Sequence, residues 1–404
     1  MTAAMKIGVV LEQELHSGGG FQQALNALEQ LTAIAPPWLQ IAVFTTAPAN
    51  AGHAALAGRD LHVVPRGAAE RLRSAALART LPAALDQWCA RHDVLTALER
   101  AMVAEGVDLV YFLSPSGYAL ALRQLPYILT VWDLCHRDHP EFPEVRAQGE
   151  FARREAFYRE AINRAVLTLT DSEELNQRMA QYYGAESGRL LAMPFQPAGF
   201  ARESASASTN NRVQRLGLPA DYLFYPAQFW PHKNHVRILQ ALALRKAQGQ
   251  SHAVVFCGGD KNNKPYIQRL ATELGVAGQV SFIGFVPEAD MQALYRHCRA
   301  LVMPTYFGPT NLPPLEAWAL GKPVIYSAHL AGQVGDGALC VDPDSAEELA
   351  AAIATVYDNA EATRALAARG QARLEYLGTL RRQAEATFLK KLESFNNRKL
   401  CWGK

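Results

Sequence analysis

Short runs of apolar residues, rich in branched side chains, recur along the chain, and each is followed by a segment with helical spacing. The runs are continuous rather than alternating, which indicates strands buried on both faces, as in a parallel sheet covered by helices. They occupy residues 6–11, 40–45, 61–65, 108–113, 127–133 and 166–170, and then 222–227, 253–257, 280–285, 300–304 and 323–327. This pattern predicts an α/β fold with two doubly wound parallel sheets.

The alternation of strands and helices fails once, in a polar stretch at residues 198–220 that is crowded with Ser, Thr and Asn. Such a composition is typical of a linker. We therefore expect one domain over 1–197, the linker, a second domain over 221–375 and a helical segment over 376–404. Ligands of doubly wound sheets bind at the carboxyl ends of the strands, so a cleft between the domains is the expected site.

Composition excludes several classes of protein. A length of 404 residues suits two domains of roughly 200 residues each. Hydrophobic residues at 49% and charged residues at 19% exclude a mainly disordered chain. A net charge of only +2 removes the electrostatic argument for a nucleic-acid binder. The six cysteines form no CxxC pair, which favours buried thiols of a cytosolic protein over a zinc cage or disulfides.

Neither a secretory leader nor a membrane span is expected. Only five apolar or small residues separate Lys6 from Glu12, and the longest uncharged stretch, 30–58, contains three prolines. We expect a cytoplasmic protein. A basic, partly apolar helical stretch at 66–79 is most simply a solvated helix. The alternative is contact with anionic lipid, which would place the protein peripherally at the inner face of the cytoplasmic membrane.

The first strand runs into a glycine triplet, Gly18, Gly19 and Gly20, followed by a helical stretch. Glycines let the backbone approach a ligand, and a helix amino terminus offers unpaired N–H groups to an anion. The third glycine of a GxGxxG motif is replaced by Gln23, so no nicotinamide cofactor is expected. A tight turn is the alternative explanation of the triplet.

The strongest local signal is the segment 305–318, in which a strand ends, a loop follows and two prolines open a helix. Backbone N–H groups around Asn311 and Leu312 would form an anion site. Glu316 follows in the first turns, where it is placed to accept hydrogen bonds from ribose hydroxyls, although a carboxylate there also compensates the helix dipole. In the turn after residue 227, Lys233 is a compact cation suited to a phosphate, although a lone lysine usually faces solvent.

Residues 222 to about 344 resemble the nucleotide-binding domain of the retaining GT-B glycosyltransferases of family four, the group 1 glycosyltransferases. The resemblance is carried, in order, by Pro231-His232-Lys233-Asn234, Cys257-Gly258-Gly259, 280–284, 312–317, 321–324 and 334–339. The amino-terminal half matches loosely, through its glycine-rich loop and residues 131–134. The resemblance implies a GT-B fold: two Rossmann-like domains, an interdomain cleft and a carboxy-terminal helix that crosses back to the first domain.

The resemblance also implies a site for a nucleoside-diphosphate sugar. Lys233 would contact the diphosphate, Glu316 the ribose, and the amides near Asn311 the phosphate or sugar, while the glycine triplet approaches from the other domain. The implied donor-binding residues are Gly18, Gly19, Gly20, Gln228, Lys233, Gly308, Thr310, Asn311, Leu312 and Glu316. Neither a metal nor another cofactor is expected, because Lys233, amides and helix dipoles would neutralise the leaving diphosphate.

Three positions depart from the family pattern. Gly308 stands where a Glu usually faces the donor sugar, eight residues before Glu316. Gln228 replaces a basic residue, and Trp132 replaces a histidine. The missing carboxylate suggests a donor with fewer hydroxyls there, such as a 6-deoxyhexose, with Thr310 or Asn311 as substitute partners.

His136 and Arg137 are nearby substitutes for the missing histidine, and together with Asp133 they are the candidate catalytic residues. Asp133 and His136 would orient the acceptor hydroxyl, and Arg137 would supply positive charge. The alternative is that His136 is simply a polar loop residue.

The expected function is transfer of a hexose or deoxyhexose from a nucleoside-diphosphate sugar to a glycan or lipid-linked hydroxyl, with retention, in surface polysaccharide or O-antigen biosynthesis. One alternative is a catalytically weakened, nucleotide-sugar-binding partner protein, which the three departures suggest. Another is a sugar-nucleotide epimerase with a GT-B fold. Lys233 and Glu316 favour the transferase.

Overall fold

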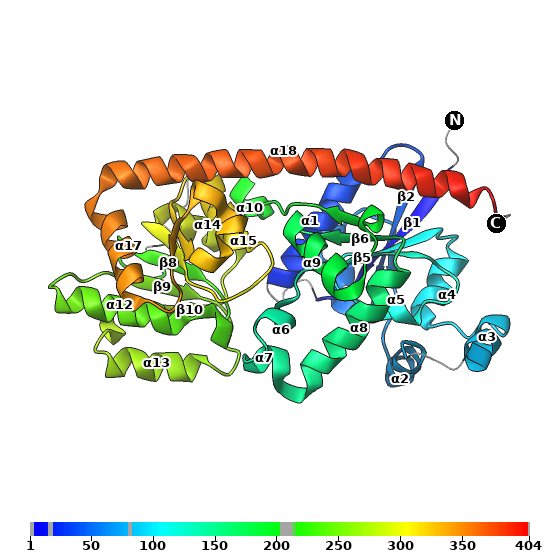
Figure 1. Cartoon of the computed structure of the whole chain (residues 1–404), viewed down its shortest axis with the longest axis horizontal. Helices are drawn as coiled ribbons and strands as arrows, with labels where there is room; N and C mark the ends of the chain where they lie inside the picture. Colours follow the sequence, from blue (N-terminus) through cyan, green and yellow to red (C-terminus); the bar gives the residue numbers. More distant parts are fainter. Residues whose placement is uncertain (1–3, 15–18, 80–82, 203–212, 214, 403–404) are drawn as a thin grey trace. The chain divides into compact units, whose positions relative to one another are not determined.

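A computed structural model describes residues 4–14, 19–79, 83–202, 213 and 215–402. The chain forms two compact units. Unit 1 contains the chain up to Leu134, Ala152–Phe195 and the chain from Leu380 onward, whereas unit 2 contains Cys135–Phe151 and Gln196–Thr379. Each unit is built on its own parallel sheet (Figure 1).

The sheet of unit 1 has seven strands in the order β3-β2-β1-β4-β5-β6-β7, and every pairing is parallel. Its strands are β1 (Met5–Leu11), β2 (Leu39–Thr45), β3 (Leu61–Val63), β4 (Leu109–Phe112), β5 (Tyr127–Thr130), β6 (Leu167–Thr170) and β7 (Leu190–Ala192). The chain adds strands to one side of β1 and then, from β4 onward, to its other side. The place between β1 and β4 where the strand order reverses is the switch point at which such sheets bind ligands.

Helices cover both faces of this sheet, which explains the continuous apolar runs. Along β1, Ile7 and Val9 belong to the core shared with α1, whereas Val10 belongs to the core shared with α4, α8 and α9. The helices that lie wholly in unit 1 are α1 (Gly19–Ile34), α2 (Ala68–Leu77), α3 (Ala83–Arg91), α4 (Ala97–Ala104), α5 (Tyr118–Ala121) and α9 (Glu173–Tyr183), with 3-10 turns at Pro48–Gly52, Ala54–Leu56 and Ser187–Arg189; α8 (Glu150–Arg164) starts at the boundary with unit 2.

The sheet of unit 2 has six parallel strands in the order β10-β9-β8-β11-β12-β13. They are β8 (Leu223–Pro226), β9 (Val254–Cys257), β10 (Val280–Gly284), β11 (Ala300–Met303), β12 (Val324–Ser327) and β13 (Leu339–Val341). The order again reverses beside the first strand, between β8 and β11, so the loops after these two strands should carry the site. The predicted fold class, α/β with two doubly wound parallel sheets, is confirmed.

Unit 2 includes two helices of one turn each from an earlier part of the chain, α6 (Cys135–Asp138) and α7 (Pro143–Arg146), followed by a 3-10 turn at Ala147–Gly149. The others are α10 (Gly199–Arg202), α12 (His235–Ala247), α13 (Lys264–Glu273), α14 (Glu288–His297), α15 (Leu312–Ala319), α16 (Ala331–Val334) and α17 (Ala346–Asp358), with 3-10 turns at Pro231–Lys233, Ala277–Gln279, Ala328–Leu330 and Gly335–Gly337. The domain predicted over 1–197 therefore includes residues 135–151, which the structure places in unit 2.

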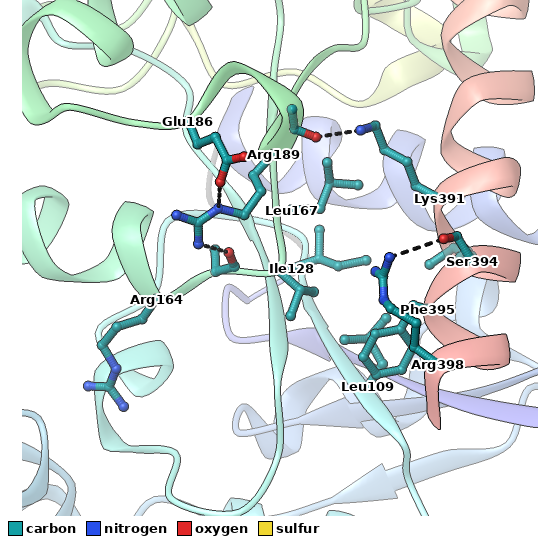
Figure 2. A pocket seen from close by; sticks show the side chains of 14 residues that line it. Leu109, Ile128, Arg164, Leu167, Glu186, Arg189, Lys391, Ser394, Phe395 and Arg398 are labelled. Carbon is teal, nitrogen blue, oxygen red and sulfur yellow. Dashed lines mark hydrogen bonds and ion pairs between the residues drawn. The ribbon is translucent and has the colours of Figure 1, made fainter. Parts of the chain in front are cut away.

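Helix α18 (Ala360–Lys399) is 40 residues long, and its residues from Leu380 onward belong to unit 1. Phe388, Leu392 and Phe395 are buried there in the same core as strand β1. Beside them, the helix and the amino ends of β4, β5 and β6 border a cavity of about 490 Å³ (Figure 2). Among the described helices, none combines the length and apolar character required to cross a membrane.

Candidate functional site

The loop after β8 is fixed to two other loops of unit 2. The 3-10 turn Pro231–Lys233 ends at Asn234, which has a left-handed φ of 54°. The Asn234 side-chain amide donates to the carbonyls of Pro304, at 3.0 Å, and Pro343, at 2.8 Å. Because both hydrogen bonds are buried, this asparagine sets the position of its neighbour Lys233.

Lys233 is the start of a chain of hydrogen bonds along the carboxyl edge of the sheet. Its ammonium donates to Asn311 Oδ1 at 3.2 Å, and Asn311 Nδ2 donates to the Tyr326 hydroxyl at 2.6 Å. That hydroxyl donates to Gln333 Oε1 at 2.7 Å, and Gln333 Nε2 donates to the Gly308 carbonyl at 3.2 Å. A single network thus joins the cation to the loop at position 308.

Gly308 is a position where a side chain does not fit. Its φ of 153° disfavours other residues, and a Cβ built there would lie 2.8 Å from Asn311 Oδ1. The structure therefore explains the departure from the family pattern, because a glutamate at 308 would displace the amide that holds Lys233. Thr310, in the same loop, is half-buried.

Asn311 is the N-cap of α15, and Leu312 is the first residue of that helix. The Asn311 side chain makes no capping bond to α15, since it holds Lys233 and Tyr326 instead. Pro313 and Pro314 have no N–H, so the backbone donors at the start of α15 are those of Asn311 and Leu312, and they share one loop cluster with the Lys233 ammonium. Together they provide the kind of positive surface that binds phosphate.

Glu316 lies one turn into α15 and is 7% exposed. The Tyr295 hydroxyl, from α14, donates to Glu316 Oε2 at 2.6 Å. Burial raises the pKa of Glu316 to about 7, although the hydrogen bond from Tyr295 acts in the opposite direction. The carboxyl group therefore changes its charge near neutral pH.

Gln228 lies two residues after the end of β8, and its Oε1 accepts a hydrogen bond from the Trp230 indole at 3.0 Å. Close by, the loops after β8 and β9 approach so tightly that a Cβ on Gly258 would lie 2.2 Å from the carbonyl oxygen of Ala227. Only glycine fits at this position, which explains why the Cys257-Gly258-Gly259 motif has a glycine at 258.

Residues 135–151 bring an unpredicted carboxylate to the Lys233 loop. Glu144, in α7, accepts a hydrogen bond from the backbone N–H of His232 at 3.0 Å and is paired with His232 Nδ1. Burial would raise the pKa of Glu144, but the hydrogen bonds from His232 and from its own backbone amide outweigh burial and lower the pKa. On its other side, the His232 ring stacks on Phe307, with ring centroids 4.0 Å apart.

The candidate catalytic residues are divided between the two units. Asp133 belongs to unit 1, where it forms an ion pair with Arg154 at 3.1 Å. His136 and Arg137 lie in α6 of unit 2. The His136 ring is fully buried, with its edge toward Phe151 at a centroid distance of 5.5 Å.

The carboxyl edge of the unit 1 sheet also holds a carboxylate that the sequence analysis missed. Glu12 directly follows β1 and accepts a hydrogen bond from the Ser116 hydroxyl, which follows β4. Burial raises the pKa of Glu12, whereas Ser116 and Arg66 lower it. The sequence does contain a signal for Glu12, because a carboxylate directly after a buried strand lies at the edge where ligands bind.

Two glycines of the triplet lie at the same edge. Gly19 and Gly20 are the first residues of α1, and Gly18 lies outside the described residues. A Cβ on Gly20 would be 3.2 Å from the ring of Trp132. Trp132, which replaces the family histidine, thus packs against Gly20 at the start of α1.

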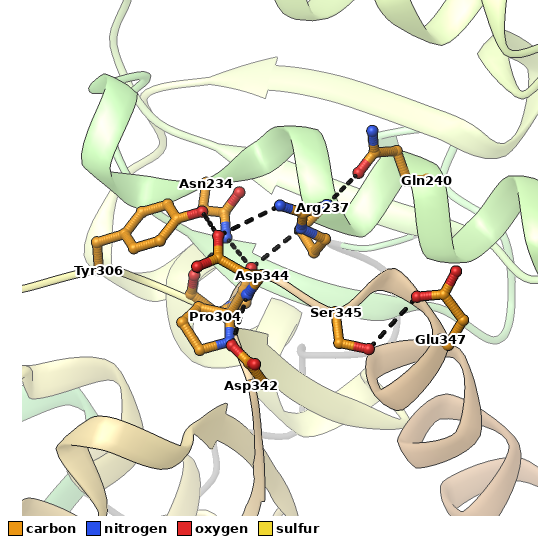
Figure 3. Close-up of polar contacts among 10 residues, drawn as sticks. Asn234, Arg237, Gln240, Pro304, Tyr306, Asp342, Asp344, Ser345 and Glu347 are labelled. Carbon is orange, nitrogen blue, oxygen red and sulfur yellow. Dashed lines mark hydrogen bonds and ion pairs between the residues drawn. The ribbon is translucent and has the colours of Figure 1, made fainter.

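The Asp342-Pro343-Asp344 sequence resembles a metal-binding carboxylate pair in its letters, but its groups have other partners (Figure 3). Asp344 Oδ1 is paired with Arg237 at 3.4 Å and accepts a hydrogen bond from the Tyr306 hydroxyl at 2.5 Å. Asp342 Oδ1 accepts from the Asp344 N–H at 2.9 Å. Within the described residues, no three His, Cys, Asp or Glu side chains are grouped so that they could hold a metal ion.

Comparison with known proteins finds a matching family model and relatives that cover part of the chain. Residues 208–373 match the family model of glycosyl transferases group 1. The O-antigen chain mannosyltransferase B of Escherichia coli is 25% identical over 215 residues, which cover 52% of this chain and 56% of that protein. A D-inositol 3-phosphate glycosyltransferase of Salinispora arenicola is 32% identical over 207 residues, 47% of this chain and 44% of that protein. The chain thus spans about half the length of these relatives.

Solved structures are similar over nearly the whole chain. Anabaena Alr3699/HepE in complex with UDP-glucose has a TM-score of 0.70 at 18% identity and covers 96% of this chain and 100% of its own. WaaG, a glycosyltransferase involved in lipopolysaccharide biosynthesis, has a TM-score of 0.66 at 16% identity. The match covers 94% of this chain and 98% of WaaG. At these identities the likeness shows the fold, and the predicted GT-B fold is confirmed.

Proposed function

Because its residues 208–373 match the family model of glycosyl transferases group 1, we propose that this protein transfers a sugar from a nucleoside diphosphate to an acceptor hydroxyl. The observation that carries the proposal is the network at the carboxyl edge of the unit 2 sheet. There Lys233 is held 3.2 Å from Asn311, the N-cap of α15, and Glu316 is buried one turn further on. A cation, helix amides and a carboxyl group in this order match a diphosphate followed by a ribose.

The chemistry requires stabilisation of the leaving group. The bond between the anomeric carbon and the diphosphate oxygen breaks, the acceptor oxygen bonds to that carbon, and the hydroxyl proton passes to the departing diphosphate. Lys233 and the backbone N–H groups of Asn311 and Leu312 would neutralise the charge that develops on the diphosphate. Similarity to the retaining family supports an acceptor that approaches on the face from which the diphosphate leaves, and no metal is needed for this step.

For the acceptor we propose a glycan or lipid-linked saccharide of a surface polysaccharide, since two of the relatives are O-antigen chain mannosyltransferases. Glu12 and Ser116, at the carboxyl ends of β1 and β4, are the proposed acceptor-binding groups of unit 1. We also propose peripheral membrane contact through α2. Its Leu72 is 74% exposed, and Arg71 and Arg73 beside it are exposed, so the helix presents an apolar and a basic group to anionic lipid.

The test is a screen of nucleoside-diphosphate sugars for ligand-induced thermal stabilisation, followed by mass spectrometry of the products with and without a glycan acceptor pool. Transfer that requires the acceptor supports the proposal. Donor binding without any turnover would instead show a weakened partner protein, and a changed sugar nucleotide without acceptor would show an epimerase.

Lys233→Met provides the matched variant, because it keeps most of the side-chain volume and removes the charge. We expect donor affinity to fall by about ten- to a hundredfold at an unchanged melting temperature of the free protein. Unchanged donor affinity would show that Lys233 does not contact the diphosphate.

A further inference from the structure

In unit 2, an arginine of helix α18 holds the short helix α16. Arg373 is one of the α18 residues that belong to unit 2. Its Nη2 donates to the carbonyl of Gly332 at 3.0 Å and to the carbonyl of Gln333 at 3.3 Å. Both carbonyls belong to α16, and the last four carbonyls of a helix have no partner within that helix. Arg373 therefore fixes the backbone of α16 from outside.

Close packing brings α18 within reach of this segment. A Cβ on Gly370, three residues before Arg373, would lie 2.1 Å from Cδ1 of Trp318, so the backbone of α18 lies directly against that indole. The Trp318 indole N–H donates to the Gly337 carbonyl at 3.0 Å. A Cβ on Gly337 would in turn lie 3.2 Å from Cβ of Arg373. Two glycines thus allow the approach that lets Arg373 contact α16.

The side chain of Gln333 is part of the hydrogen-bonded network that contains Lys233. Its Oε1 accepts from the Tyr326 hydroxyl at 2.7 Å, and its Nε2 donates to the Gly308 carbonyl at 3.2 Å. The same hydroxyl accepts from the Asn311 amide, which in turn accepts from Lys233. Gln333 therefore connects α16 to both ends of the loop that carries the partner of Lys233.

From these contacts we propose that Arg373 is a positioning residue of the donor site. Arg373 holds the backbone of α16, this backbone fixes the Gln333 amide, and the amide orients the loop that presents the N–H groups of Asn311 and Leu312 beside Lys233. The effect on donor binding rests on the proposed function, whereas the effect on the loop rests on these contacts alone.

Arg373→Met is the test variant, because it keeps an aliphatic side chain and removes every donor. Arg369→Met is its matched control. Arg369 lies about one turn earlier on the same helix, and it donates to the Asp336 carbonyl at 3.0 Å, beyond the end of α16. Arg373→Lys keeps a charged donor and should retain most of the wild-type behaviour.

The first readout needs no ligand. It is the position of the backbone amide resonances of Gly308, Asn311 and Leu312 in two-dimensional NMR spectra of the free full chain. We expect these resonances to move by more than a linewidth in Arg373→Met and to stay in place in Arg369→Met. Unmoved resonances in Arg373→Met, or equal movement in both variants, would overturn the proposal.

The second readout is the affinity for a nucleoside diphosphate, measured by isothermal titration with UDP, GDP, ADP and dTDP in turn. The tightest binder should bind Arg373→Met about five- to tenfold more weakly, and Arg369→Met less than about twofold more weakly. Added to Gln333→Leu, the Arg373→Met change should cost less than about twofold, because the amide through which Arg373 acts is already removed. Additive losses would show another route and overturn the proposal.

The positioning role and the proposed function can fail separately. Moved resonances in Arg373→Met, with no nucleoside diphosphate bound by the wild type, would support the positioning of the loop and refute the proposed donor site. Binding by the wild type that Arg373→Met leaves unchanged would support the donor site and overturn the role of Arg373. Gln333→Leu alone should move the same resonances, and unmoved resonances in that variant would contradict the second link.

Discussion

Glu316→Gln should stabilise unit 2 at alkaline pH while it weakens donor binding. Burial raises the pKa of Glu316 from 4.5 to about 7. A group with a raised pKa contributes its full stability below its unfolded pKa and loses that contribution as pH rises through its folded pKa. The difference of about 2.5 units, at 1.36 kcal/mol per unit, amounts to about 3 kcal/mol. The glutamine does not titrate, so the variant should escape this loss.

The assay is hydrogen exchange of the α15 amides by mass spectrometry, which reports the opening of unit 2 itself. Between pH 4.5 and pH 8, the free energy of opening should fall by about 3 kcal/mol more in the wild type than in Glu316→Gln. Glu347→Gln, at an exposed position of α17, is the control and should follow the wild type. An identical pH dependence in the wild type and Glu316→Gln would refute the argument, because Glu316 would then ionise as it does in water.

Donor binding provides the second readout. If ribose hydroxyls donate to Glu316, the ligand prefers the ionised carboxylate, so donor affinity should rise as pH increases toward about 7 and then level off. A nucleoside-diphosphate sugar suits this measurement because its own phosphates do not titrate in this range. Glu316→Gln should bind it about tenfold more weakly at pH 8 and without this pH dependence. Equal affinities at pH 8 would remove Glu316 from the ribose site.

Three further predictions concern the same site. Glu144→Ala should lower kcat/KM for the donor by about tenfold because His232 loses its acceptor, and Glu144→Gln should recover most of it; equal losses in both variants would contradict a hydrogen-bonding role. Gly308→Ala should weaken donor affinity about as much as Lys233→Met, because its Cβ would displace the Asn311 amide at 2.8 Å, and wild-type affinity in the alanine variant would disprove this. Chelator should leave the transfer rate near its starting level, whereas a complete loss that Mn²⁺ restores would show a metal-dependent step.

The sequence predicts the strands that are buried on both faces because their composition alone marks them. Strand β1, for example, has all but one of its seven residues fully buried. The edge strands β7 and β13, each of three residues, have no counterpart among the predicted runs. The edge strand β3 is equally short, but the apolar run around it continues to residue 65 and marks it. The turns after β9 and β11 were predictable because their glycines and prolines meet local backbone requirements, as at Gly258, where a Cβ would clash, and at Pro313, in the first turn of α15.

Nothing in the sequence indicated that residues 135–151 belong to unit 2 and not to unit 1. Glu144 and His232 are 88 positions apart, and nothing in the local pattern of either segment indicates that they meet. Glu12 and Ser116, 104 positions apart, are a similar case, since only the neighbouring positions of β1 and β4 in the sheet bring them together. Contacts of this kind follow from topology rather than from local sequence.

The departures from the family pattern form a consistent set when seen in the structure. A glutamate at 308 would require a side chain where the Asn311 amide lies, and the chain has glycine there. That amide links Lys233 to Tyr326 in the hydrogen-bonded network of unit 2. Gln228, which replaces a cation, accepts a hydrogen bond from Trp230, so it orders the same loop without adding charge. Compared with the family pattern, the proposed donor site lacks one carboxylate and one cation together, so its charge balance is kept. We therefore propose that these departures redirect the donor preference and do not abolish the proposed activity.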